Sequence, residues 1–230
     1  MSSYFFRNKQ IINMKPTIIK QASIIIMFAL TAVIYFNCDD SGVNPTNNPL
    51  TISGQISGWN LGNKTLSARI ESVTGHNYEI ANCPIDASGN FSLTLPATVS
   101  DTTLYSGDSV FTMGCSGTVT INPADSKGTR MWRFNVMDTI TVLGYIRFCN
   151  YDTLFAGAFE DVFLYVNKDL SVSGTQYCFP GDTIMYNGTA KSGWNTVYEN
   201  YIRKFSAYGY VILYNNTQPS GGAWKFVSFY

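Results

Sequence analysis

The residues best suited to acid–base chemistry are one histidine and a few carboxylates. His76 lies in a predicted loop, and the chain has no Gly-x-Ser-x-Gly segment whose serine it could activate. A glycoside hydrolase needs two carboxylates that meet in space, and the sequence offers these candidates: Glu71, Glu79, Glu160 and Asp161. Glu160 and Asp161 are adjacent, so on a strand they would point to opposite faces. We therefore predict no catalytic residues and no enzyme activity.

The segment Asp86–Asn90 is the one stretch that resembles part of a calcium loop. It supplies a single carboxylate, whereas calcium loops provide several oxygen ligands at alternating positions. The sequence Asp-Ala-Ser-Gly-Asn instead predicts a hairpin turn, in which Asp86 and Asn90 bond to the backbone and Gly89 adopts positive φ. We predict neither a metal ion nor a cofactor.

After residue 49 the chain has four widely spaced cysteines: Cys83, Cys115, Cys149 and Cys178. An even number of cysteines in an exported chain favours two disulfides, for which three connectivities exist. Loop closure favours pairing of sequence neighbours, Cys83 with Cys115 and Cys149 with Cys178. A zinc site is the rival, although the chain has no Cys-x-x-Cys pair and one histidine. Buried free thiols are the third alternative.

Cys38 stands between an apolar run and a polar stretch. The uncharged run Ala22–Phe36 is shorter than the roughly 20 residues that span a bilayer, and it follows Lys15 and Lys20. This arrangement resembles the signal peptide of a bacterial lipoprotein, with residues 1–37 removed and Cys38 lipidated. Met14 is the more economical start, because a compact basic segment follows it. An ordinary signal peptide and an uncleaved anchor remain alternatives, since Asn37 is an uncommon residue before a lipidated cysteine.

Residues 38–49 predict a tether, because Gly, Pro and Asn dominate without apolar periodicity. Asp39 and Asp40 resemble the surface-export signals of Bacteroidetes-type lipoproteins, whereas in enterobacteria an Asp there favours inner-membrane retention. We expect a cell-envelope protein held by its lipid at the outer membrane, on either the periplasmic or the surface face.

The charge balance argues against nucleic acid as a partner. Residues 1–37 hold four of the 15 basic residues and no acidic one, which leaves 11 basic against 15 acidic residues. A mildly acidic chain with scattered charges lacks the basic patch that nucleic-acid binding needs.

From Leu50 onward, apolar and polar residues alternate with period two, which predicts half-buried strands separated by Gly, Pro and Asn. The rhythm of about ten residues predicts an all-β, antiparallel sandwich, either two tandem β-units (50–137 and 138–230) or one enlarged sandwich. The clearest predicted strands are Thr65–Ser72, Asn90–Leu95, Thr118–Ile121, Arg130–Val136, Ile140–Cys149, Asp161–Val166, Leu170–Tyr177, Thr183–Asn187, Trp194–Ile202, Gly209–Tyr214 and Ala223–Phe229.

The segment Ile52–Pro96 carries a resemblance to a known family. Its Gly-centred first strand and its Asp-x-x-Gly-Asn-Phe turn resemble carboxypeptidase-regulatory-like and transthyretin-like β-sandwiches. This resemblance implies a sandwich fold and no particular activity.

The aromatic residues give one functional hint. Exposed Trp and Tyr on a sheet can stack on sugar rings, and Trp194 and Trp224 follow glycine turns that favour a position at the rim. The alternative is that these aromatics fill the core. We expect a structural or interaction module of the cell envelope whose partner is an envelope protein or a glycan, with a glycan-binding protein as the second hypothesis.

Overall fold

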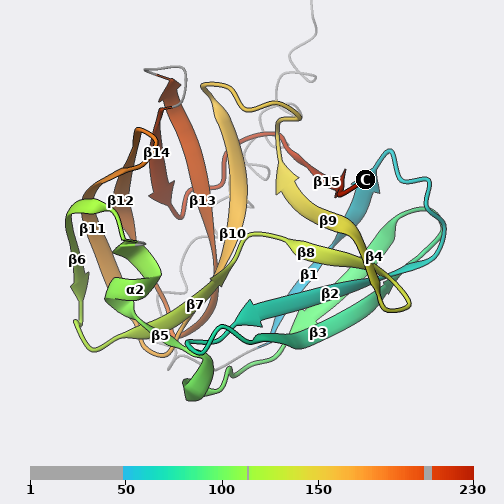
Figure 1. Cartoon of the computed structure of the whole chain (residues 1–230), viewed down its shortest axis with the longest axis horizontal. Helices are drawn as coiled ribbons and strands as arrows, with labels where there is room; N and C mark the ends of the chain where they lie inside the picture. Colours follow the sequence, from blue (N-terminus) through green and yellow to red (C-terminus); the bar gives the residue numbers. More distant parts are fainter. Residues whose placement is uncertain (1–48, 113, 205–208) are drawn as a thin grey trace, which may run out of the picture. The chain divides into compact units, whose positions relative to one another are not determined.

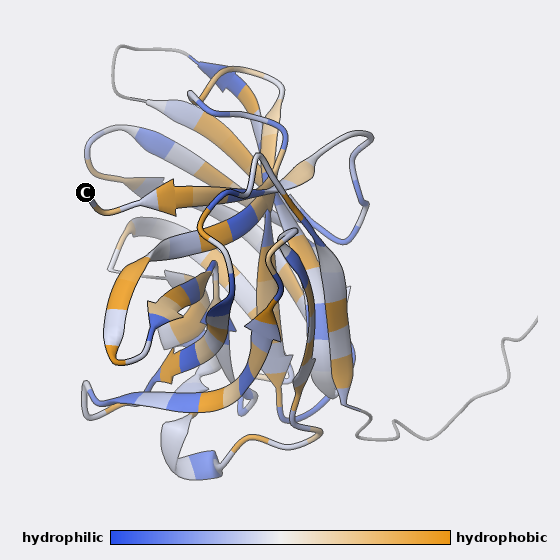
Figure 2. Ribbon diagram, turned by 90° about the vertical axis from the view of Figure 1, so that its right-hand side faces the viewer, coloured by the Kyte–Doolittle hydropathy of each residue, from blue (hydrophilic) through white to orange (hydrophobic). Residues whose placement is uncertain are grey.

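The structure is a computed structural model that describes residues 49–112, 114–204 and 209–230. These residues belong to one compact unit, Pro45–Tyr230, and the predicted all-β class is confirmed. Along the strands hydrophobic and hydrophilic residues alternate (Figure 2). In β4 (Asn90–Leu95), for example, every second side chain is buried, as a half-buried strand requires. The predicted signal peptide, Cys38 and most of the tether lie outside the described residues.

One group of strands forms a closed ring (Figure 1). The order around the ring is β15 (Ala223–Ser228), β1 (Leu50–Ser57), β4, β3 (Asn77–Ile85), β2 (Lys64–Glu71), β8 (Phe134–Asp138) and β9 (Thr141–Cys149), and β9 pairs again with β15. The fully buried Leu66, Leu93, Phe134 and Ile146 fill the ring. Closure satisfies the backbone of both potential edge strands, because β15 lies between β1 and β9.

The remaining strands form a curved sheet. Its order is β6 (Ser116–Asn122), β11 (Leu170–Cys178), β12 (Asp182–Ala190), β14 (Tyr210–Asn215), β13 (Gly193–Lys204), β10 (Ala158–Val166), β7 (Lys127–Met131) and β5 (Tyr105–Ser106). The short helix α2 (Gly107–Thr112) packs against this sheet through Val110 and Phe111 (Figure 1). The Tyr186 hydroxyl holds the helix by donating to the Phe111 carbonyl at 2.7 Å.

The chain passes from the curved sheet to the ring at Trp132 and Arg133. We predicted one strand over residues 130–136, and this prediction is wrong: β7 ends at Met131 and pairs with β10, whereas β8 begins at Phe134 and pairs with β2 and β9. Met131 and Phe134 both lie in the core of the ring. In an unbroken strand, residues three apart point to opposite faces, so both can reach one core only if the strand breaks between them.

The expected boundary between residues 137 and 138 does not separate two units. β9 and β15 from the second segment complete the ring, and β7 from the first segment joins the curved sheet. Both segments therefore contribute strands to a closed ring and to a curved sheet within one compact unit. The pairing that closes the ring joins residues far apart in sequence, such as Ile56 and Trp224, and alternation within one strand does not specify such a partner. Among the described residues, no helix has the length and apolar character needed to cross a bilayer.

Candidate functional site

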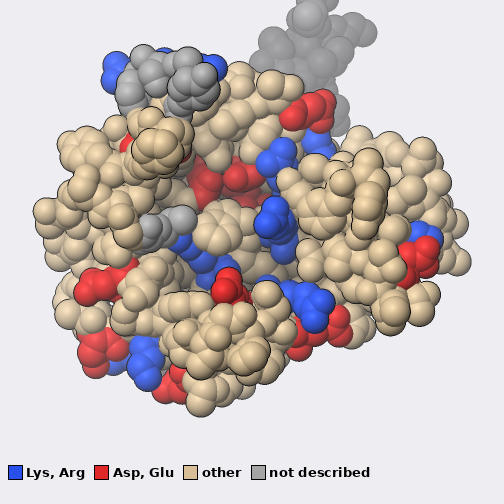
Figure 3. Space-filling model, in the orientation of Figure 1, with Lys and Arg blue, Asp and Glu red and all other residues tan. Residues whose placement is uncertain are grey.

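A groove lies between the ring and the curved sheet. Three hollows of about 180, 290 and 270 Å³ share Trp132 as a lining residue. We call them together the central groove, defined by Arg69, Glu71, Arg130, Trp132, Arg133, Tyr145, Arg147 and Glu160. In Figure 3, basic and acidic side chains gather in the hollow at the centre of the face shown. The break between β7 and β8 places Trp132 and Arg133 in this groove.

Aromatic rings hold two of the groove arginines. The Arg130 guanidinium lies 4.3 Å from the centre of the Trp132 ring, and that of Arg133 lies 4.7 Å from the centre of the Tyr145 ring. Guanidinium groups at such distances are attracted to the face of an aromatic ring. This attraction orients both side chains, and neither guanidinium forms an ion pair with a carboxylate among the described residues.

Three arginines of the central groove form no ion pair within the described part of the chain. Within residues 49–112, 114–204 and 209–230, ion pairs include Arg147 with Glu160 but none with Arg69, Arg130 or Arg133. The buried Nε of Arg69 also has no hydrogen-bond partner there. Burial lowers the pKa of Arg130, since a charged group is less stable away from water. The lining includes four arginines and two glutamates, Glu71 and Glu160, and so holds more basic than acidic side chains.

Glu160, which lines the groove, is joined by a phenol to a second carboxyl group, the buried Glu199. Glu160 on β10 lies directly opposite Glu199 on β13 in the antiparallel register. The Tyr201 hydroxyl lies 3.2 Å from Glu160 Oε1 and 3.1 Å from Glu199 Oε2. Tyr201 follows Glu199 by two residues and therefore projects from the same face of β13. Strand register alone thus brings the three groups together.

Further donors bind the two carboxyl groups. Glu160 Oε2 accepts from the Tyr151 hydroxyl at 2.7 Å and from Arg147 Nη1 at 3.1 Å. Glu199 Oε1 accepts from Trp132 Nε1 at 2.8 Å, so Trp132 contacts both Glu199 and Arg130. We call Glu160, Glu199 and Tyr201 the carboxyl pair and its bridge.

Burial controls the ionisation of Glu199 and Tyr201. Burial, followed by the charge of Glu160, raises the pKa of Glu199 to about 7. Burial, followed by the Glu199 charge, raises the pKa of Tyr201 above its ordinary value, so this phenol keeps its proton. Glu199 therefore keeps its proton to a higher pH than an ordinary glutamate does.

Asp161 points away from the groove, which confirms that Glu160 and Asp161 lie on opposite faces. Its carboxyl is buried and accepts the Phe148 backbone N–H at 3.2 Å. Burial raises the pKa of Asp161 to about 8. Asp161 therefore belongs to the packing of β9 against β10 and not to the groove.

The predicted cysteine pairing is wrong. Cys115 is bonded to Cys178, at the point where β6 and β11 pair side by side, whereas Cys83 and Cys149 are buried free thiols. The two free thiols belong to different cores, Cys83 to that of the ring and Cys149 to that of the curved sheet. The architecture therefore provides for one disulfide and two buried thiols.

The predicted stacking platform is not formed. Trp224 is 8% exposed and packs among aromatic rings in the ring core, including Phe134 and Phe163. Gly54 makes room for it, since a Cβ at this position would collide with the Trp224 ring. Trp194 is partly buried, and its Nε1 donates to the Pro96 carbonyl at 2.9 Å. Both indoles are thus packing elements, and the rim position expected after the glycine turns is incorrect for Trp224.

The remaining sequence candidates have simple structural roles. Asp86 Oδ1 accepts the backbone N–H groups of Ser88 at 2.8 Å and Asn90 at 2.9 Å, and Gly89 has φ 84°, so the predicted turn is confirmed. His76 is exposed in the loop before β3. In the described part of the chain, no three His, Cys, Asp or Glu side chains are grouped to hold a metal ion.

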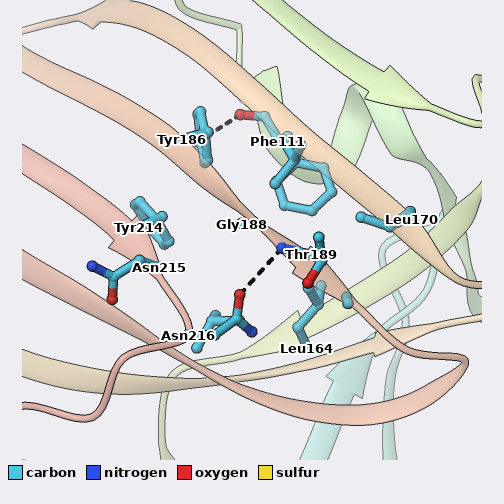
Figure 4. A pocket seen from close by; sticks show the side chains of 12 residues that line it. Phe111, Leu164, Leu170, Tyr186, Gly188, Thr189, Tyr214, Asn215 and Asn216 are labelled. Carbon is cyan, nitrogen blue, oxygen red and sulfur yellow. Dashed lines mark hydrogen bonds between the residues drawn. The ribbon is translucent and has the colours of Figure 1, made fainter. Parts of the chain in front are cut away.

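A second pocket lies in the core of the curved sheet (Figure 4). Leu164, Leu170 and Phe111 line it, and its free volume is about 20 Å³. Such a space holds no more than about one water molecule. The Asn216 side chain accepts the Thr189 N–H near its mouth, as Figure 4 shows. This pocket is a packing gap and not a ligand site.

The sequence analysis missed most of the central groove. Arg130, Trp132 and Arg133 were assigned only to a continuous strand, and Glu199 and Tyr201 received no role. One local signal was present, because Met131 and Phe134 are apolar residues three apart and do not fit period-two alternation. Comparison of the chain with protein-family models, with curated proteins and with solved structures gives no match.

Proposed function

We propose that this protein is a lipid-anchored binding module of the cell envelope, and that it binds an anionic ligand in the central groove. The anchor rests on the apolar run that ends at Cys38 and on the polar stretch that follows. The single observation that carries the ligand proposal is the presence in one groove of three arginines that form no ion pair among the described residues: Arg69, Arg130 and Arg133.

The positive charge of the groove, and the stability lost by keeping that charge unpaired, both support ligand binding as its role. Arg69 and Arg130 are partly buried. Keeping such a cation without a close counter-ion costs stability, and proteins accept such costs mainly at functional sites. A guanidinium offers several N–H donors in a plane that matches the two oxygens of a carboxylate. Sulfate and phosphate groups present similar oxygens, so the ligand class is defined by its negative charge.

A glycan remains the second candidate ligand. Its proposed binding site moves from Trp194 and Trp224 to the central groove. Trp224 and Trp194 serve packing, whereas Trp132 and Tyr145 lie in the central groove beside the arginines. A sugar that carries a carboxylate would combine ring contacts with ionic contacts. We therefore propose that acidic glycans bind better than neutral ones.

The test is calorimetric titration of the purified full chain with trigalacturonate, and with maltotriose as a neutral probe of similar size. We expect binding of trigalacturonate only. Arg133→Ala should weaken this binding by roughly tenfold, which corresponds to about 1.4 kcal/mol for a lost charged contact. Arg203→Ala is the matched control, because Arg203 is exposed and does not line the groove. Equal binding of the two sugars, or unchanged binding in Arg133→Ala, would refute the proposal.

A further inference from the structure

The two contacts of the Tyr201 hydroxyl in the carboxyl pair and its bridge need more protons than one phenol supplies. The Tyr201 hydroxyl contacts an oxygen of Glu160 and an oxygen of Glu199 at similar distances. A hydroxyl has one proton, so it can donate to only one of these carboxylates at a time. If both carboxyl groups were ionised, one would face the oxygen of Tyr201 with no proton between them.

One additional proton resolves the contacts. When Glu199 is protonated, its Oε2–H donates to Tyr201, and Tyr201 donates to Glu160 Oε1. The mirror arrangement, with the proton on Glu160, satisfies the same two contacts. The other partners favour the first arrangement, because Arg147 and Tyr151 both donate to Glu160 and stabilise its negative charge, whereas Glu199 receives one neutral donor, Trp132.

We propose that Glu160 and Glu199 share one proton through Tyr201, and that this proton leaves Arg130 free for the anionic ligand, so that the groove binds ligand and proton together. The inference rests on the proposed function for its ligand. Arg130 stacks on the indole whose Nε1 bonds to Glu199, so a charge on Glu199 would attract Arg130. An ionised Glu199 therefore competes with the ligand for the same guanidinium.

The charged and titratable groups around Glu199 agree with the proposal that an anion in the groove favours a protonated Glu199. The described groups that face it come from several elements: Glu160 on β10, Tyr201 on β13, Arg130 on β7 and Tyr186 on β12. Among these four, Arg130 is the one cation, and Arg147 lies beyond Glu160. Ionisation of Glu199 would thus place a second negative charge beside Glu160, while ligand binding would remove the influence of Arg130. Both effects favour the protonated pair when an anion occupies the groove.

The first experiment needs no ligand. Carbon-13 NMR of the full chain, labelled at glutamate side-chain carboxyls, follows each group between pH 4 and 10. We expect the Glu199 signal to report loss of a proton near neutral pH, and the Glu160 signal to change over the same pH range because Tyr201 contacts both groups. Glu199→Gln should remove this transition, and Tyr201→Phe should separate the two responses. Loss of the Glu199 proton at an ordinary glutamate value, with no accompanying change in the Glu160 signal, would overturn the shared proton.

The second experiment measures trigalacturonate binding at pH 6 and pH 8.5, where the sugar carboxylates stay ionised. We expect the dissociation constant to rise about tenfold at pH 8.5 for the natural protein and less than threefold for Glu199→Gln, whose amide cannot ionise. An equal rise in both proteins would overturn the coupling. Absence of binding at both pH values would overturn the proposed function and the coupling, whereas the shared proton is judged by the NMR titration alone.

Discussion

Replacing Glu199 by Gln should stabilise the protein at alkaline pH. The Gln side chain keeps the shape of a protonated Glu, since its oxygen can accept from Trp132 Nε1 and its amide can donate to Tyr201. It cannot ionise, and it therefore escapes the cost of a buried negative charge. Most substitutions of buried groups destabilise a protein, so a gain in stability is a specific expectation.

The magnitude follows from the change in proton affinity. Burial raises the pKa of Glu199 from 4.5 to about 7, and each unit corresponds to about 1.4 kcal/mol, which gives about 3 kcal/mol. Between these values the unfolded chain releases the proton that the folded protein retains, so the stability of the natural protein falls as pH rises. The variant should match the natural protein below pH 4.5 and exceed it by about 3 kcal/mol above pH 7.

The assay is thermal and urea unfolding of both proteins at pH 4.5 and pH 8.5. A gain of about 3 kcal/mol raises Tm by roughly 6–12 °C in a domain of this size. Asp161 titrates identically in both proteins, so the difference isolates Glu199. Glu79→Gln is a contrasting control, because hydrogen bonds from Ser67 and Asn82 lower the pKa of Glu79 and its replacement should not stabilise. A difference that is absent at pH 8.5, or equal at both pH values, would refute the reasoning.

Three other predictions concern packing and covalent structure. Trp224→Ala should lower the free energy of unfolding, measured in urea, by about 3–5 kcal/mol, because this indole lies in the core of the closed ring of strands. A loss below about 1 kcal/mol would contradict that position. Peptide mapping without reduction should recover Cys115 linked to Cys178, and any other cysteine pair would contradict the fold. Intact-mass analysis of the membrane fraction should give a chain that begins at Cys38 with diacylglycerol, and an unmodified soluble chain would rule out the anchor.

Local patterns carried the parts of the fold that depend on neighbouring residues. Alternation predicted β4, and the short polar side chain of Asp86 predicted its turn, since both depend on contacts within a few residues. The same alternation placed Glu160 and Asp161 on opposite faces. These features need no knowledge of the partner strand.

Long-range register determined what the sequence could not predict. Glu160 meets Glu199 because β10 and β13 pair in one register, and a slip of one residue would send either side chain to the other face. The parallel insertion of β15 beside β1 buries Trp224, which the adjacent glycine turn had suggested would be exposed. Helix α2 has six residues, which is too short for a helical pattern to be recognised.

The most direct test of the anion-binding groove is NMR of the arginine Nε–H groups in the nitrogen-15-labelled full chain. On addition of trigalacturonate, the signals of Arg69, Arg130 and Arg133 should shift together with a single dissociation constant, and maltotriose should leave them unchanged. Shifts confined to other arginines, or equal responses to both sugars, would contradict the account.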